Sequence, residues 1–209
     1  MKIVLTTALY LIVLFILPLL GTMDELFDTK VILSAIVILL LLNTQPPTNF
    51  KEGSRDRSTD KGTMYLILVT GVIGHIGSLI DWAYFPSFTV GQSVLVGAFL
   101  MIFGIIFRIV AIQSLKYGFS SSIRIKEGQQ LFTRGLYSKL RHPSYTAAWI
   151  LMIGDALLFQ SYFGLAILGV GMFLVYMKRI QVEEEVLLKK YGKEYEDYMQ
   201  RTWKFLPWY

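Results

Sequence analysis

The residues whose types and spacing suggest chemistry form one run, Arg141, His142, Pro143, Ser144 and Tyr145. Proline fixes φ and lacks an N–H, so a helix is predicted to begin at Pro143. The residue before it, His142, is pushed towards an extended backbone. The free N–H groups at the start of such a helix attract anions, and Arg141 and His142 add donors beside them. On this motif alone two interpretations stay open: a ligand site, or a membrane-entry turn whose basic residues contact lipid phosphates.

A second group of candidates lies on a helix predicted to continue from residue 178 to residue 191. Glu183 is spaced to pair with Arg179 four residues back, and Glu185 with Lys189 four residues ahead. Glu184 has no such partner. It shares a stripe with apolar and aromatic side chains: Ile180, Leu187, Leu188, Tyr191, Tyr195 and Tyr198.

A carboxylate such as Glu184 on a packed helix face costs free energy unless it has a cationic partner. That partner is expected to be Arg141, Arg108 or a cationic ligand, and ligand binding is favoured over a structural ion pair. The end of the chain, residues 191–208, is dense in tyrosine and tryptophan. Alone, this pattern favours anchoring at the membrane interface over an aromatic wall for a cationic ligand.

The composition identifies the elements that must position these residues as membrane helices. The chain has 209 residues, of which 54% are hydrophobic, and the apolar residues come in long runs. The fold class is therefore predicted to be all-α, a polytopic integral membrane protein. The sequence contains no cysteine, which excludes disulfides and thiol nucleophiles. Its two histidines, His75 and His142, lie far apart in sequence, so no metal site is expected.

Six apolar runs predict about six spans, at residues 3–20, 31–42, 63–80, 92–112, 144–159 and 162–177. The first is predicted to be an uncleaved helix, because no small-x-small cleavage site follows it. The second is short, so Leu26 and Phe27 are expected to extend it. Only Gln160 and Ser161 separate the last two, which predicts a tight helical hairpin.

The third run carries small residues at helical spacing, Gly71, Gly74, Gly77 and Ser78, which predicts close helix packing. His75 lies among them. A histidine inside a membrane is a functional candidate, yet no acidic residue lies close to it in sequence. An interhelical hydrogen bond is therefore the favoured interpretation.

The basic residues predict the orientation. With six spans, 18 of the 20 lysines and arginines fall on one side: Lys2, the linker 43–62, the segment 113–143 and the tail after residue 177. The positive-inside rule then places both termini in the cytoplasm of a cell (inner) membrane. The linker, the segment 113–143 and the tail are expected to meet there, forming a pocket open to both cytosol and membrane.

The last ~95 residues resemble the isoprenylcysteine carboxyl methyltransferase (ICMT) family and its phospholipid methyltransferase relatives, in the short prokaryotic form. The motifs that carry the resemblance follow one another with the family's spacing: Gly135-Leu-Tyr137, Arg141-His142-Pro143-Ser-Tyr145, Glu183-Glu184, Tyr195, Tyr198, Arg201 and Pro207. We therefore divide the chain into N-terminal membrane helices, residues 1–112, and a methyltransferase region, residues 113–209.

The resemblance implies S-adenosylmethionine as the methyl donor, with S-adenosylhomocysteine as its product. Family roles carry over to His142, Tyr145, Glu183, Glu184 and Arg201. The predicted cofactor-binding residues are Tyr137, Arg141, His142, Pro143, Tyr145, Glu183, Glu184 and Tyr195, and the predicted catalytic residues are Arg201, Arg108 and Glu184. The donor has a carboxylate that suits a helix N-terminus, an ammonium that suits Glu184 and a sulfonium that suits aromatic rings. The mechanism expected is direct in-line methyl transfer to the carboxyl or other polar head group of a lipidic, isoprenylcysteine-like substrate that enters from the bilayer.

In this mechanism Arg201, with Arg108 as second choice, orients the substrate's carboxylate or phosphate. The expected partners are a lipidic or prenylated small molecule and membrane lipid, with no nucleic acid. Thr146 stands where methyltransferases of this kind often have glycine, and Thr146-Ala147 disfavours the related sterol reductases, which use NADPH. That reductase, a phospholipid N-methyltransferase and a non-catalytic lipid-binding scaffold stay open as alternatives, as do the methyl acceptor and the oligomeric state.

Overall fold

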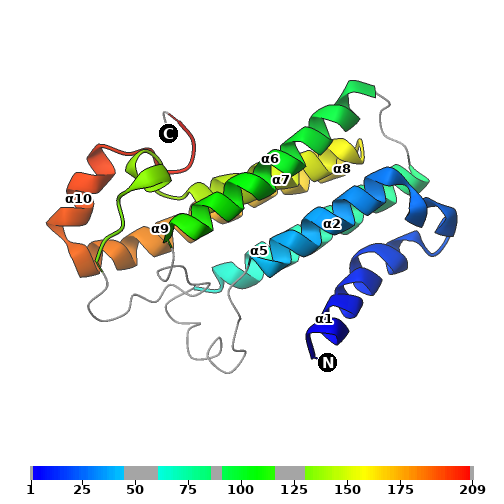
Figure 1. The fold of residues 1–209 in the computed structure, drawn as a ribbon, viewed down its shortest axis with the longest axis horizontal. Helices are drawn as coiled ribbons and strands as arrows, with labels where there is room; N and C mark the ends of the chain where they lie inside the picture. The colour runs from blue at the N-terminus through cyan, green and yellow to red at the C-terminus, as the bar shows by residue number, and fades with distance from the viewer. Residues whose placement is uncertain (1, 45–60, 86–90, 116–129, 208–209) are drawn as a thin grey trace.

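The structure, a computed structural model, describes residues 2–44, 61–85, 91–115 and 130–207, with the side chains described from residue 7 onward. In these ranges the regular elements are helices, joined by one isolated β-bridge. The chain runs back and forth along a single bundle (Figure 1). Helix α6 packs along α7, α2 contacts α6 and α7, and α5 contacts α7, α8 and α9 (Figure 1).

The helix bounds follow the predicted runs closely. They are α1 (Lys2–Leu11), α2 (Thr29–Asn43), α5 (Thr63–Tyr84), α6 (Gly91–Leu115), α7 (Pro143–Leu158), α8 (Tyr162–Gly164), α9 (Met172–Tyr191) and α10 (Lys193–Gln200). A π-helical turn (Ile12–Ile16) and a 3-10 turn (Leu17–Leu19) continue α1, and a π-helical segment (Leu165–Gly171) joins α8 to α9. Two further 3-10 helices are Met23–Phe27 and Gly135–Ser138.

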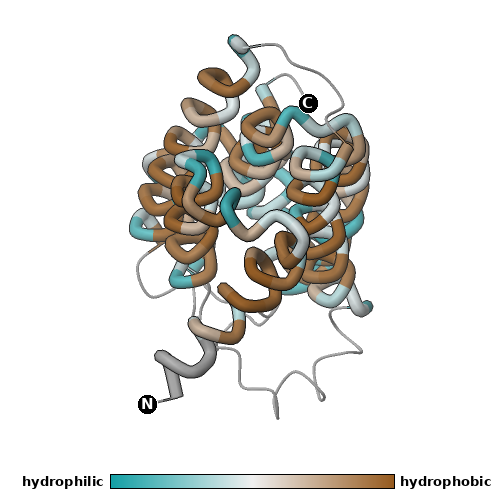
Figure 2. Tube along the Cα trace, turned by 90° about the vertical axis from the view of Figure 1, so that its right-hand side faces the viewer, coloured by the Kyte–Doolittle hydropathy of each residue, from teal (hydrophilic) through white to brown (hydrophobic). Residues whose placement is uncertain are grey.

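In the described ranges, three helical stretches are long and apolar enough to cross a membrane: Thr63–Tyr84, Gly91–Leu115 and Tyr162–Tyr191. Two shorter apolar helices, Thr7–Leu19 and Thr29–Asn43, lie with them. Hydrophobic residues dominate the length of the bundle (Figure 2). The all-helical, membrane-type fold is thus confirmed, whereas six full crossings remain a prediction.

One predicted extension is wrong. Leu26 and Phe27 do not extend the second span. They belong to a separate 3-10 helix, and α2 begins only after Asp28, whose carboxylate accepts a hydrogen bond from the Lys30 amide at 2.7 Å. The third span, predicted to end near Ile80, continues as α5 to Tyr84. Residues 45–60 of the predicted linker 43–62, and residues 116–129 of the segment 113–143, lie outside the described residues.

Helix α7 packs closely against α6 at glycines. A Cβ on Gly97 would lie 2.4 Å from the backbone nitrogen of Leu158, and one on Gly104 would lie 2.8 Å from the carbonyl oxygen of Ala147. The two backbones therefore approach more closely than any side chain allows. The glycines of α5 pack inside the chain too, Gly74 against Leu168 and Gly77 against Phe163, which confirms the packing role predicted for them.

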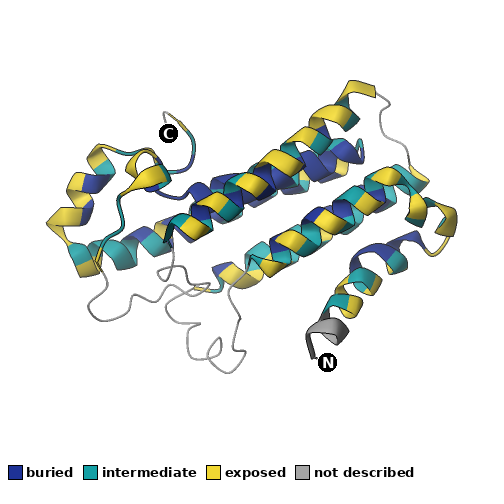
Figure 3. Cartoon of the chain, viewed as in Figure 1, coloured by how far each residue is buried: buried dark blue, intermediate teal, exposed yellow. Residues whose placement is uncertain are grey.

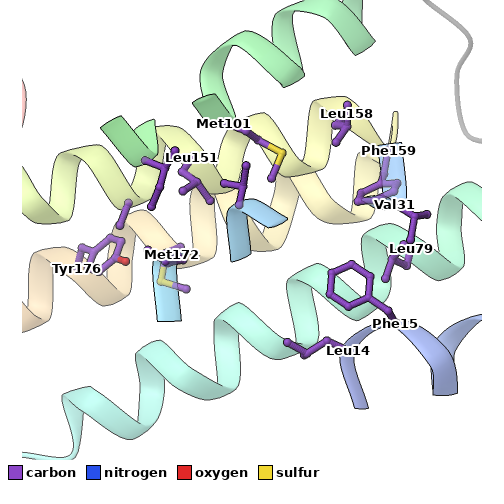
Figure 4. Close-up of a cluster of buried hydrophobic side chains, with 14 of the residues drawn as sticks. Leu14, Phe15, Val31, Leu79, Met101, Leu151, Leu158, Phe159, Met172 and Tyr176 are labelled. Atoms are coloured by element: carbon purple, nitrogen blue, oxygen red, sulfur yellow. The ribbon is translucent and has the colours of Figure 1, made fainter. Parts of the chain in front are cut away.

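The apolar core runs along the middle of the bundle (Figure 4). Phe15, Leu79, Met101, Leu158 and Phe159 are buried at its centre. Burial is most continuous along α7, and the outer face of α6 is exposed (Figure 3). An exposed apolar face on α6 is what contact with lipid requires.

His75 makes the interhelical hydrogen bond that the sequence predicted. Its Nδ1 lies 2.8 Å from Oδ2 of Asp155 on α7, and the hydroxyl of Ser34 on α2 donates to Oδ1 of Asp155 at 2.7 Å. All three side chains are buried. The sequence did not identify this partner, because 80 residues separate Asp155 from His75.

Candidate functional site

The candidate site lies at the end of the bundle where three separate pieces of the chain meet. Arg108 Nε donates to the Thr44 hydroxyl at 2.9 Å, and Arg179 Nη1 donates to the Thr63 hydroxyl at 3.0 Å. Lys61 pairs with Glu185 at 2.7 Å. These contacts tie the chain on either side of residues 45–60 to α6 and α9, whereas a pocket formed by all three predicted segments stays a prediction.

A short loop delivers the Arg-His-Pro motif to this end. Gly135 adopts a positive φ of 61° and opens the 3-10 helix Gly135–Ser138. Leu140 then pairs with Trp203 in a parallel bridge. Helix α7 begins at Pro143, as predicted, with His142 at its N-cap. Proline at the first helical position thus fixes where the two preceding side chains project.

Glu184 is the centre of the site. Its Oε1 accepts hydrogen bonds from Arg141 Nε at 2.7 Å and from His142 Nε2 at 3.2 Å, while the Tyr195 hydroxyl lies 3.5 Å away. Lys204 Nζ is 3.9 Å from Oε2. The Glu184 side chain is only 7% exposed. The unpaired carboxylate expected on the packed face therefore has a partner inside the chain, Arg141, one of the three that the sequence suggested.

The anion site expected at the start of α7 depended on Arg141 and His142 as donors, and both residues have partners within the chain. Arg141 Nη1 donates to the carbonyl oxygens of Met199 and Thr202, and the Arg141 backbone amide donates to the carbonyl of Trp203 at 2.8 Å. The His142 amide donates to the carbonyl of Lys204 at 3.2 Å. The Nε, Nη1 and backbone N–H groups of Arg141 are thus committed to Glu184 and to the C-terminal part of the chain.

Glu183 occupies a different environment from its neighbour. Its Oε2 accepts a hydrogen bond from the Tyr145 hydroxyl at 3.0 Å and lies 4.0 Å from His142 Nδ1. The side chain is 30% exposed. Arg179 Nε in turn donates to the Tyr145 hydroxyl at 3.2 Å, so this phenol bridges the predicted pair of Arg179 and Glu183. The ion pair found for Glu185 is with Lys61 rather than the predicted Lys189.

Stacked rings line the α7 side of the site. The Tyr145 ring lies 5.9 Å from the imidazole of His142 and 5.3 Å from the ring of Tyr176. Phe205 is fully buried, with its ring 5.6 Å from that of Trp149. Such faces suit a cationic group.

Three further tyrosines, Tyr137, Tyr195 and Tyr198, contact one another next to Glu184. The Tyr198 hydroxyl donates to the carbonyl of Tyr137, and the rings of Tyr195 and Tyr198 lie 5.8 Å apart. Burial raises the pKa of Tyr198 to about 12. Burial, and then the charge of Glu184, raise the pKa of Tyr195 well above its ordinary value. These phenols stay protonated at neutral pH and serve as donors.

The two arginines expected to orient a substrate lie in very different places. Arg201 is exposed at the C-cap of α10. Arg108 is buried, donates from Nη1 to the carbonyl of Ser144 at 2.9 Å, and lies close enough to Tyr145 and Tyr176 to interact with them electrostatically. The structure therefore places Arg108, the second choice, at the site, and Arg201, the first choice, at the surface.

Sequence reasoning missed the segment formed by residues 202–206. Lys204 approaches Glu184, Phe205 enters the aromatic cluster, and Thr202 accepts from Arg141. The only signal in the sequence was the density of aromatic residues there, which was interpreted as interfacial anchoring.

The comparisons with known proteins agree with this architecture. Residues 96–189 match the model of the isoprenylcysteine carboxyl methyltransferase (ICMT) family. The chain is 29% identical over 138 residues to the protein-S-isoprenylcysteine O-methyltransferase of Dictyostelium discoideum, covering 65% of this chain and 58% of that protein. It is 30% identical over 114 residues to the probable protein-S-isoprenylcysteine O-methyltransferase of Oryza sativa subsp. indica, covering 54% and 60%. The chain thus spans about three fifths of the length of these curated relatives.

A solved structure shares the fold. The eukaryotic intramembrane Ras methyltransferase ICMT superposes with a TM-score of 0.62 at 19% identity, covering 95% of this chain and 70% of that one. The family-model match, residues 96–189, covers most of α6, all of α7 and most of α9. Residues 96–189 therefore match the ICMT family, on a membrane fold similar to that of ICMT, and the family resemblance that the sequence motifs indicated is confirmed.

Proposed function

We propose that this protein is an integral membrane methyltransferase that uses S-adenosylmethionine to methylate the carboxyl group of a lipidic, isoprenylcysteine-like substrate. The active end of the bundle faces the cytoplasm of a cell membrane, with both chain termini on that side. The family match and the names of the relatives support the reaction class.

The observation that carries this proposal is the contact between the two motifs of the resemblance. Arg141 and His142 both donate to Glu184, although 43 and 42 residues separate them in sequence. A buried, charged cluster is expensive in a membrane protein, so it is maintained where it serves a function. A scaffold that only binds lipid has no use for a cluster turned inward.

The arrangement divides the work between the two glutamates. The carboxylate of Glu184 is already compensated by Arg141, His142 and Lys204, so it organises the site. Glu183 accepts one hydrogen bond from Tyr145 and is partly exposed, so it is the carboxylate open to the ammonium of the methyl donor. The stacked faces of Tyr145 and Tyr176 suit its sulfonium. The residues present therefore fit this cofactor.

S-adenosylmethionine supplies an activated methyl group when it is bound. The residues of the chain then need only to exclude water, hold the acceptor in line and stabilise its charge. A carboxylate acceptor carries no proton to lose, so no general base is required. Arg108, buried beside Tyr145, is placed to orient the acceptor's carboxylate by charge-assisted hydrogen bonds.

Calorimetric titration of the detergent-purified chain with S-adenosylhomocysteine tests this function, and a parallel titration with NADPH tests the reductase alternative. Glu183→Gln is expected to weaken S-adenosylhomocysteine binding at least roughly tenfold, the loss of one charged hydrogen bond. The adjacent change Glu185→Gln is the matched control, because that side chain faces Lys61 outside the site, and it is expected to bind like wild type. Binding of NADPH alone would refute the proposal.

A further inference from the structure

We propose that Thr146 is a positioning residue that fastens the C-terminal strap, defined as residues 202–206, over the cluster of Arg141 and Glu184. This inference rests on the proposed function, since the strap covers the cluster that organises the proposed donor site. The hydroxyl of Thr146 donates to the carbonyl oxygen of Phe205 in the strap. It also lies 3.2 Å from the carbonyl oxygen of His142 one turn back.

The strap is paired with the Arg-His-Pro loop along its backbone. The Trp203 amide donates to the carbonyl of Lys139 at 2.9 Å, the Arg141 amide returns a bond to Trp203 at 2.8 Å, and the His142 amide donates to Lys204 at 3.2 Å. Parallel pairing over so few residues is weak by itself. Side-chain contacts are needed to hold the strap in place.

Two of those contacts involve the charged cluster itself. Arg141 Nη1 bonds the carbonyl oxygen of Thr202, and Lys204 lies 3.9 Å from Glu184. The Lys204 side chain is 38% exposed, so screening by water makes its ion pair a weak anchor. Because Arg141 bonds both Glu184 and the strap, a displaced strap removes acceptors from the same guanidinium that holds Glu184.

The remaining contacts fasten the strap to α7. The Phe205 ring is fully buried, 5.7 Å from the ring of Phe173 and 6.2 Å from that of Tyr176. Apolar contact holds the ring but does not fix the backbone next to it. The buried Thr146 hydroxyl fixes the orientation of that backbone, because it donates a directional hydrogen bond to the Phe205 carbonyl.

From this arrangement the role of Thr146 follows. Its hydrogen bond sets the register of the strap against the loop, and the strap excludes water from Arg141, His142 and Glu184, each less than 9% exposed. Charges in a drier environment interact more strongly, which keeps the Arg-His-Pro motif aligned on Glu184. Thr146 thus affects the donor site through the strap, without touching the donor.

The test compares Thr146→Val, which keeps the volume but removes the hydroxyl, with Thr146→Ser, which keeps the hydroxyl. Thr22→Val is the matched control, because within the described chain the Thr22 hydroxyl is buried without a hydrogen-bond partner. Hydrogen–deuterium exchange of the Trp203 and His142 amides reports the strap, and calorimetry with S-adenosylhomocysteine reports the donor site.

We expect Thr146→Val to raise the exchange rate of these amides, and to weaken S-adenosylhomocysteine binding, by about five- to tenfold each, the effect of one hydrogen bond. Thr146→Ser and Thr22→Val should match wild type in both measurements. Unchanged exchange in Thr146→Val would overturn the inference, and so would faster exchange with unchanged binding. A wild-type chain that binds no S-adenosylhomocysteine would instead refute the proposed function, and the exchange rates would still decide whether Thr146 holds the strap.

Discussion

Replacing Asp155 tests how much the buried network of α2, α5 and α7 contributes to stability. The carboxylate accepts from Ser34 at 2.7 Å and contacts His75 at 2.8 Å, and all three side chains are buried. Asp155→Leu keeps a similar volume and removes both acceptors. The Ser34 hydroxyl can turn to a backbone carbonyl in its own helix, but His75 Nδ1 is left without a partner.

The magnitude follows from these two bonds. Hydrogen bonds between membrane helices average about 0.6 kcal/mol and reach about 1.7 kcal/mol, and a buried unsatisfied group costs about 1–3 kcal/mol. We expect Asp155→Leu to lower the free energy of unfolding by about 2–3 kcal/mol. For a chain of this size the melting temperature in detergent should fall by about 5–10 °C.

Asp155→Asn is the matched control for Asp155→Leu, because asparagine can keep both hydrogen bonds. An asparagine accepts from Ser34 with its oxygen and offers its amide to His75 Nδ1, provided that the imidazole moves its proton to Nε2. His75 Nε2 has no hydrogen-bond partner among the described residues, so that move breaks no bond. Asp155→Asn should therefore cost less than about 1 kcal/mol.

The measurement is thermal unfolding in detergent, with S-adenosylhomocysteine affinity as a second readout. Affinity should stay within twofold of wild type, because Asp155 lies 12 residues, about 18 Å, along α7 from Pro143. If Asp155→Leu melts within about 2 °C of wild type, the network adds no stability. If Asp155→Asn is as unstable as Asp155→Leu, the reasoning about the imidazole proton is refuted.

Three further outcomes are expected. Gly97→Ala should lower the melting temperature clearly, because its Cβ meets backbone at 2.4 Å, whereas Gly169→Ala, which has nothing within 4 Å, should not; equal effects would contradict the packing argument. Burial raises the pKa of Tyr198 to about 12. The folded chain therefore keeps a proton that the unfolded chain loses above about pH 10, so stability falls from there towards pH 12. Tyr198→Phe should reduce the loss of stability between about pH 10 and pH 12 in pH-dependent melting curves. An unchanged loss would show that another group causes it. Arg108→Met should lower kcat/KM at least about a hundredfold, the loss of a buried charged contact, and Arg201→Gln less than about threefold; the reverse order would restore Arg201 as the orienting residue.

The sequence by itself determined much of the architecture. The long apolar runs predicted the helical membrane fold, because backbone polar groups in lipid must be satisfied within each segment. Pro143 set the start of α7, since the proline ring is incompatible with a position further inside a helix. The family resemblance followed from the spacing of several motifs and was confirmed by the match over residues 96–189.

Only the tertiary structure decided which partners the charged and polar side chains take. Glu184 had three candidate partners in the sequence and takes Arg141, 43 residues away. His75 takes Asp155, and Thr146 takes Phe205, across 80 and 59 residues. Helical periodicity reports which face a residue lies on, but not which helix packs against that face. Pairings between distant segments depend on the three-dimensional packing of the whole bundle, so only the tertiary structure identifies them.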